Sequence, residues 1–248
     1  MTERLSDAQR DRYAWQIDIP GFGPAGQAKL CAASAMVSRC GGLGGAVCYN
    51  LAAAGIGKLV LAHGGAVEIG DLNRQILMTH DWLGKPRVEC AARRLREFNP
   101  DLRIEAIGAN VSAANVRELV EPVDIVFDCA PRFSERFLMN RECVRQNKPM
   151  IEAAVFGMEG LVTTIVPGRT PCLACLYPED PPAWNRRFPV FGAVAALAAS
   201  VAAMEGIKVL TGFAETLAGT LLYFDAGDMS FRRTPVARRP DCKVCGEL

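Results

Sequence analysis

Two pairs of closely spaced cysteines constrain this chain more than any other feature. Cys172 and Cys175 form one C-x2-C pair, Cys242 and Cys245 form a second, and 66 residues separate the two pairs. Each pair presents two thiolates from one tight turn, and two such pairs complete a tetrahedral zinc site. Because four protein ligands leave no position for water, the sequence predicts a structural zinc that joins both segments. Chance pairing and a redox pair are the alternatives.

Length and composition exclude several classes of protein. The chain has 248 residues, of which 50% are hydrophobic and 22% charged, as in ordinary soluble globular proteins. Its net charge of +1 gives no reason to expect nucleic acid or a membrane as partner. The N-terminus lacks the apolar core of a signal peptide, and the longest apolar run, residues 190–204, is shorter than the ~20 residues of a membrane span. We therefore expect a cytoplasmic protein.

Apolar strand-like stretches alternate with helical patterns over the first 155 residues. This alternation predicts a Rossmann-like, doubly wound α/β sheet that is mostly parallel. The expected strands span residues 32–38, 58–62, 102–107, 125–129 and 150–154. The expected helices span residues 44–54, 86–99 and 134–146.

The pattern changes after residue 154. Expected strands at residues 161–166, 220–224 and 230–234 predict an antiparallel C-terminal extension of the sheet. A long, alanine-rich helix is expected near residues 192–210, and an exposed loop at 178–189. We expect one domain over residues 1–248, with a Rossmann-like core at about 30–155 and the extension, long helix and zinc site at about 156–248.

A glycine-rich segment, Gly41-Gly42-Leu43-Gly44-Gly45, lies between the first expected strand and the following helix. Glycines at such a turn let the backbone approach the phosphates of a nucleotide at a helix N-terminus. They also serve close packing of a strand against a helix, so this motif alone is a weak indication of nucleotide binding.

Together with other motifs, this segment resembles the ThiF/MoeB/HesA family. The matching stretches follow the order of that family along nearly the whole chain. They are Arg12-Tyr13, Gln16-Ile17, Gly21-Phe22-Gly23, the glycine segment, Asp71-Leu72-Asn73-Arg74-Gln75, Gly84-Lys85-Pro86-Arg87-Val88, Asn99-Pro100, Asp128-Cys129, Glu159-Gly160, Met204-Glu205-Gly206-Ile207-Lys208 and both cysteine pairs. The resemblance implies a homodimer that uses ATP and magnesium to adenylate a C-terminal carboxylate, usually the Gly-Gly end of a ubiquitin-like sulfur carrier.

The chain departs from the family pattern at positions to which the resemblance assigns ATP or magnesium. Arg39 replaces the first glycine of the loop, and His63 replaces the acidic residue that holds the ribose. The aspartate two positions later is Gly65, and the magnesium-binding, catalytic aspartate is Pro131. Proline offers no side-chain oxygen to magnesium. This leaves the chain without an assigned catalytic residue.

Two cationic positions have changed as well. Trp15 replaces an arginine that the family offers across the dimer to the ATP of its partner, and Arg87 replaces a phosphate-contacting lysine. The expected ligand-binding residues are Trp15, Arg39, Gly41, Gly42, Gly44, His63, Asp71, Arg74, Gln75 and Arg87. Arg132 is a further candidate. Their arginine content indicates a metal-free pocket for an anionic ligand, while the alternative is a decayed site with ordinary salt bridges.

Three functions stay open at this point. The first is a protein that binds a ubiquitin-like carrier, a peptide terminus or a small carboxylate without adenylating it. The second is a working adenylyltransferase with a rebuilt pocket, and the third is a non-catalytic scaffold or inactive partner subunit. The loop before the long helix, residues 184–189, contains no cysteine nucleophile. The other cysteines, Cys31, Cys40, Cys48, Cys90, Cys129 and Cys143, are expected to be buried and inert.

Overall fold

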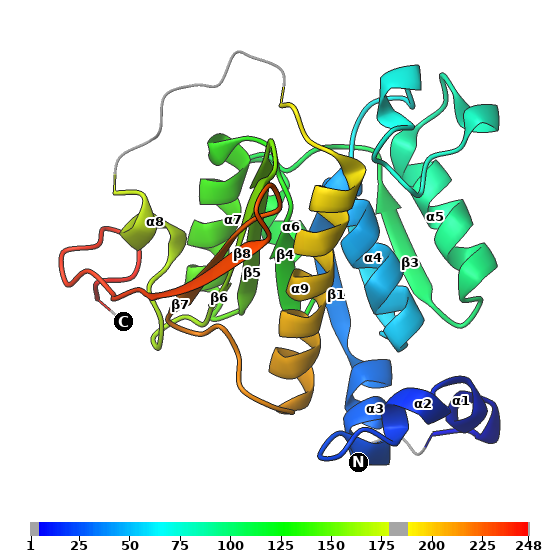
Figure 1. The fold of residues 1–248 in the computed structure, drawn as a ribbon, viewed down its shortest axis with the longest axis horizontal. Helices are drawn as coiled ribbons and strands as arrows, with labels where there is room; N and C mark the ends of the chain where they lie inside the picture. Colours follow the sequence, from blue (N-terminus) through cyan, green and yellow to red (C-terminus); the bar gives the residue numbers. More distant parts are fainter. Residues whose placement is uncertain (1–4, 179–187, 248) are drawn as a thin grey trace.

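The structure is a computed structural model that describes residues 5–178 and 188–247 (Figure 1). The expected loop at residues 178–189, including the segment 184–187, therefore lies mostly outside the described residues. The strands are β1 (Ser34–Ser38), β2 (Lys58–Ala62), β3 (Arg103–Ile107), β4 (Ile125–Asp128), β5 (Met150–Phe156), β6 (Glu159–Ile165), β7 (Thr220–Asp225) and β8 (Ser230–Pro235). The longer helices are α3 (Gly23–Ala32), α4 (Gly42–Ala54), α5 (Arg87–Phe98), α7 (Phe133–Arg145) and α9 (Gly192–Thr211).

All of these strands belong to one sheet of eight, in the order β3-β2-β1-β4-β5-β6-β7-β8. The strands from β3 to β5 pair in parallel, and β6, β7 and β8 continue the sheet in antiparallel fashion. The predicted fold class is therefore confirmed. Each predicted strand and helix is present with its ends within two residues of those expected.

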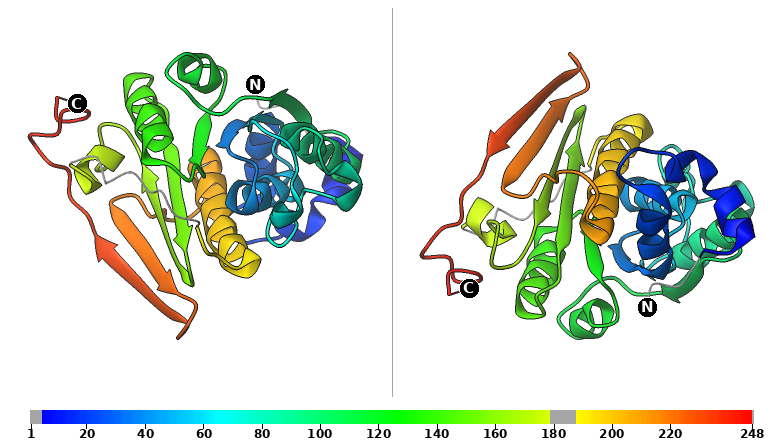
Figure 2. Two further views of the ribbon diagram at one scale, coloured as in Figure 1. Left: turned by 90° about the horizontal axis from the view of Figure 1, so that it is seen from above. Right: turned by 90° about the horizontal axis from the view of Figure 1, so that it is seen from below.

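Helices cover both faces of the sheet (Figure 2). On one face, α3, α4, α5 and α9 pack against alternate strand residues such as Ala35, Leu59 and Phe127. On the other, α7, the short helices α6 (Val116–Val120) and α8 (Leu173–Leu176), and the four paired cysteines pack against Met36, Val60 and Val126. This alternation follows from the two-residue period of a strand.

Helix α9 carries the longest apolar run of the chain. In the described part of the chain it is the one helix long and apolar enough to cross a membrane by composition. It lies against β4, β5 and β6 and against α4, and its alanines from Ala195 to Ala203 on that side are buried. Its apolar character thus fits a core helix, as expected from the sequence.

The N-terminal region is the main feature that the sequence did not predict. Helices α1 (Asp7–Arg12), α2 (Ala14–Ile17) and α3 precede β1 and lie at the opposite end of the sheet from the start of α4 (Figure 1). The side chain of Ser6 accepts a hydrogen bond from the backbone N–H of Gln9, and the side chain of Gln9 accepts one from the backbone N–H of Ser6, which caps α1. This S-x-x-Q signature was the available signal for that helix.

Candidate functional site

The strand order places a crevice at the carboxyl ends of β1 and β4. The chain proceeds from β1 outward to β3 and then returns to β4 on the other side of β1, so the connections diverge at this point. In open α/β sheets such a switch point is where ligands bind. Arg39 follows β1, His63 follows β2 and Cys129 follows β4, so three strand ends contribute to the same crevice.

A cavity of about 880 Å³ occupies this crevice. That volume lies within the range of small-molecule sites. Its lining includes seven of the expected ligand-binding residues, namely Arg39, Gly41, Gly42, His63, Asp71, Arg74 and Gln75. Pro131 also lines it.

Three expected residues do not line the cavity. Gly44 lies in the first turn of α4, where a Cβ would be 2.4 Å from the carbonyl oxygen of Arg39, so it serves close strand–helix packing. Arg87 contacts the cavity-lining residue Asp71 but does not line the cavity itself. Trp15 lies on α2 with 94% of its surface exposed, away from the cavity of its own chain. Arg132, the further candidate, is exposed and does not line the cavity either.

Arg39 is held by a carboxylate of its own chain. Its Nε and Nη2 donate to the two oxygens of Glu135, at 2.8 and 2.5 Å, in a bidentate pair. Arg39 has a φ of 61°, so it keeps the left-handed backbone that favours glycine. The side chain of Arg39 is therefore held in place by the buried Glu135 at the start of α7, a partner that was not predicted from the sequence.

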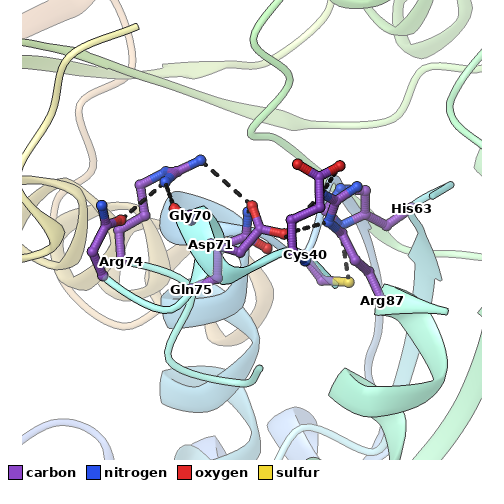
Figure 3. A network of polar contacts seen from close by, with 9 residues as sticks. Cys40, His63, Gly70, Asp71, Arg74, Gln75 and Arg87 are labelled. Carbon is purple, nitrogen blue, oxygen red and sulfur yellow. Dashed lines mark hydrogen bonds and ion pairs between the residues drawn. The ribbon is translucent and has the colours of Figure 1, made fainter. Parts of the chain in front are cut away.

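Asp71 is the centre of the polar network shown in Figure 3. Arg87 donates to its Oδ2 from Nε at 2.9 Å and from Nη2 at 2.7 Å, and Gln75 donates to its Oδ1 at 2.6 Å. Arg74 approaches from the other side, with Nη2 at 3.6 Å from Oδ1, and donates from Nη1 to the carbonyl oxygen of Gly70. Both oxygens of this buried carboxylate are thus engaged.

His63 is buried beside this network and is neutral. Burial, together with the charges of Arg39 and Arg87, lowers its pKa to about 4. Its Nδ1 lies 3.6 Å from the sulfur of Cys40, whose pKa burial raises to about 12. Because both partners stay uncharged, the pair does not form an activated thiolate.

Of the six cysteines expected to be buried and inert, five are buried, and the expected burial is wrong for Cys31. Cys40, Cys48, Cys90, Cys129 and Cys143 are buried, and Cys31 is half-buried. Burial raises the pKa of Cys31, Cys48, Cys129 and Cys143. A raised thiol pKa suppresses the nucleophilic thiolate.

The deeper end of the cavity contains charged residues that the sequence analysis missed. Glu152 on β5 and Arg136 on α7 both line it, and Arg136 Nη1 donates to Glu152 Oε1. Asp128, at the end of β4, lies directly opposite Glu152 in the register of the two strands. The available signal was a glutamate in the middle of an otherwise apolar predicted strand, because such a residue is rarely buried without a partner.

The two cysteine pairs meet as predicted. The sulfurs of Cys172, Cys175, Cys242 and Cys245 all lie within 4.8 Å of one another and are buried. The sulfur–sulfur distances of 3.7 Å between Cys172 and Cys242 and 3.4 Å between Cys175 and Cys245 are close to the roughly 3.8 Å edge of a tetrahedral ZnS4 centre. The backbone N–H of Arg239 points at Cys175. The donor set and spacing fit zinc with no open position.

The fold and the cavity define a Rossmann-like α/β protein with a ligand cavity at the switch point and a four-cysteine centre beside the sheet. The model of the ThiF family matches residues 13–244, and the chain belongs to this family. The heterocyst HesA protein of Trichormus variabilis is 47% identical over 243 residues, which cover 98% of this chain and 91% of that protein. The sulfur carrier protein adenylyltransferase of Thermus thermophilus is 37% identical over 253 residues, covering 98% of this chain and 93% of that protein.

Solved structures extend this likeness to the whole fold. Crystal structures of E. coli MccB resemble the chain closely. The structure with ATP has a TM-score of 0.86 at 26% identity and covers 98% of this chain and 76% of that one. The structure with MccA has a TM-score of 0.84 at 27% identity, with coverage of 98% and 75%.

Proposed function

We propose that this protein binds the carboxylate end of a ubiquitin-like sulfur carrier, of another peptide or of a small carboxylic acid, and does not adenylate it. Sulfur-carrier adenylation by a relative and the structure of MccB with MccA support a ligand of this kind. The cavity at the ends of β1 and β4 lies at the switch point of the sheet, which supports this location for the ligand.

One observation carries the loss of adenylation, namely the binding of Asp71 by Arg87. Magnesium requires free oxygen ligands. Of the described carboxylates that line the cavity, Asp71 and Glu68 contact Arg87, Glu152 contacts Arg136, and Glu159 contacts Tyr223. Guanidinium groups thus stand beside three of these four carboxylates, where a metal ion would compete with a covalently fixed cation.

A second candidate function is an adenylyltransferase with a rebuilt nucleotide site. The open cavity of about 880 Å³ favours it, because Gly41, Gly42, Arg74 and Gln75 still line one end. In this alternative the arginines would neutralise phosphate charge in place of magnesium. The non-catalytic scaffold is the third alternative and requires no ligand.

Isothermal titration calorimetry separates these functions. The protein is titrated with ATP, with and without magnesium, and with a hexapeptide that ends in Gly-Gly and carries a free carboxylate. We expect peptide binding without magnesium and no magnesium-dependent ATP binding. Tight magnesium-dependent ATP binding would support the second candidate, and no binding of either ligand would support the scaffold. We also propose the homodimer that the family resemblance implies. Light scattering on the same samples tests it, and a monomer mass at micromolar concentration would contradict it.

A further inference from the structure

Two buried carboxyl groups lie side by side beneath the cavity. Asp128 and Glu152 are partners in the parallel register of β4 and β5, where neighbouring strands are about 4.8 Å apart. Both residues point to the face of the sheet that α7 covers, since Phe127 and Ile151 next to them pack on the opposite face. Asp128 is fully buried, and Glu152 is 2% exposed.

One oxygen of each carboxyl lacks a hydrogen-bond partner among the described residues. These atoms are Oδ2 of Asp128 and Oε2 of Glu152, and both are buried. Two ionised carboxylates so close together and so poorly solvated would repel each other strongly. A single proton between them removes the repulsion and supplies both oxygens with a partner.

Arg136 supplies the balancing charge. Its Nη1 donates to Glu152 and lies 3.8 Å from Oδ2 of Asp128, and both of its Nη atoms lie 3.3 Å from the carbonyl oxygen of Ala153. With one proton on the pair, the three side chains are neutral together. Burial raises the pKa of Glu152, and the nearby charge of Asp128 raises it too, against the lowering effect of Arg136.

The titratable thiols near the two carboxyl groups do not supply a compensating charge. Cys129 follows β4 and Cys143 lies on α7, and burial raises the pKa of both thiols, so they stay neutral. Phe133 covers the guanidinium of Arg136, with 5.9 Å between the ring centroid and the guanidinium carbon. Among the described residues, the cation that pairs with both carboxyl groups is Arg136.

We propose that Asp128 and Glu152 share one proton beside Arg136, and that this group selects the ligand at the end of the cavity that Glu152 and Arg136 line. The guanidinium of Arg136 has five N–H donors. Arg136 lines the cavity, and its three hydrogen bonds within the chain leave two of these donors for a ligand carboxylate. While the proton is in place, the group of Asp128, Glu152 and Arg136 has no net charge and can bind that carboxylate. When the proton leaves, the group has a net negative charge and repels the carboxylate. The ligand part of this proposal rests on the proposed function.

Infrared spectroscopy tests the shared proton without any ligand. At pH 7 the protein should show the absorption of a protonated carboxylic acid. Glu152→Gln and Asp128→Asn should each abolish it, and Glu159→Gln, at an exposed position of the same cavity, should not. Each amide variant keeps one negative charge beside Arg136, so both should fold. A wild-type spectrum without this band at pH 7, or a band that persists in Glu152→Gln, would overturn the shared proton.

Calorimetry with the free-carboxylate hexapeptide tests the selecting role. Above the pH at which the infrared band disappears, wild-type affinity should fall about tenfold per pH unit, because one proton is required for binding. In Glu152→Gln the affinity should stay flat with pH, and the peptide amide should bind equally weakly at every pH. If the peptide affinity stays constant above the pH at which the infrared band disappears, the selecting role is overturned and the proposed function is unaffected. No binding at any pH would contradict the proposed function and the selecting role together, and the infrared result would still decide the shared proton.

Discussion

The guanidinium of Arg87 occupies the space that a side chain at Gly65 would need. A Cβ at residue 65 would lie 2.6 Å from Nη1 of Arg87, and Gly65 has a left-handed φ of 88°. The absence of a side chain at residue 65 and the pairing of Arg87 with Asp71 therefore depend on each other. An aspartate at this position, as the family resemblance implies, would displace Arg87.

Gly65→Ala should destabilise the protein by more than the left-handed backbone strain at residue 65 accounts for. The matched control is Gly84→Ala, because Gly84 has a φ of 78° and open space around its Cβ position. Both variants should lose about 1–2 kcal/mol to left-handed backbone strain. Gly65→Ala should lose about 1–3 kcal/mol more, because the charged hydrogen bonds of Arg87 to the buried Asp71 are disturbed. Urea denaturation measures both losses, and equal losses would show that Arg87 moves freely.

Arg39→Gly should destabilise the protein even though it restores the residue that the left-handed backbone prefers. Removing Arg39 leaves the buried Glu135 without its partner, which costs about 3–5 kcal/mol, while relief of strain returns about 1–2 kcal/mol. We expect a net loss of about 1–4 kcal/mol in urea denaturation. Adding Glu135→Gln should recover most of it, since the amide needs no counter-charge. A stable single variant would mean that the ion pair contributes nothing.

Arg39 and Arg87 illustrate which features could be predicted from the sequence and which could not. The strands and helices follow from hydrophobic periodicity, and the four-cysteine cluster follows from the spacing of its members, so both were predictable. The convergence of Arg39, His63 and Arg74 on one cavity followed from the family order of motifs. That Arg39 pairs with Glu135 and Arg87 with Asp71 was not predictable, because these partners are 96 and 16 residues apart and only packing brings them together. Glu152 and Arg136 were missed because no motif contains them.

Stability should fall as the pH drops from about 6.5 to about 4, in part through His63. The pKa of His63 is about 4 in the folded protein and near 6.5 when unfolded. Between these values the unfolded chain binds one proton more than the folded chain, so stability rises with pH across the window. The contribution is at most about 3 kcal/mol. His63→Gln should flatten this part of the pH–stability curve, whereas His80→Gln, at an exposed position, should leave it unchanged. Identical slopes in all three proteins would contradict a buried neutral His63.

Purified protein should contain close to one zinc per chain. Cys242→Ser should lower both the zinc content and the thermal stability, because a structural zinc contributes directly to the free energy of folding. Cys48→Ser is the matched control, since Cys48 is buried but lies outside the four-cysteine cluster. It should lower stability while metal analysis still finds zinc. Protein without zinc and with four freely reactive thiols would refute the site.

The central claim is that this cavity binds a carboxylate without magnesium-dependent adenylation, and ATP–pyrophosphate exchange tests it most directly. The assay uses ATP, magnesium and a sulfur carrier that ends in Gly-Gly, with the Thermus thermophilus sulfur carrier protein adenylyltransferase as the positive control. We predict no exchange above background, because each lost interaction lowers the rate about tenfold for every ~1.4 kcal/mol. Pro131→Asp alone should not restore exchange while Arg39 remains paired with Glu135. Robust magnesium-dependent exchange by the unmodified protein would contradict the account and identify the arginine-rich cavity as a rebuilt ATP site.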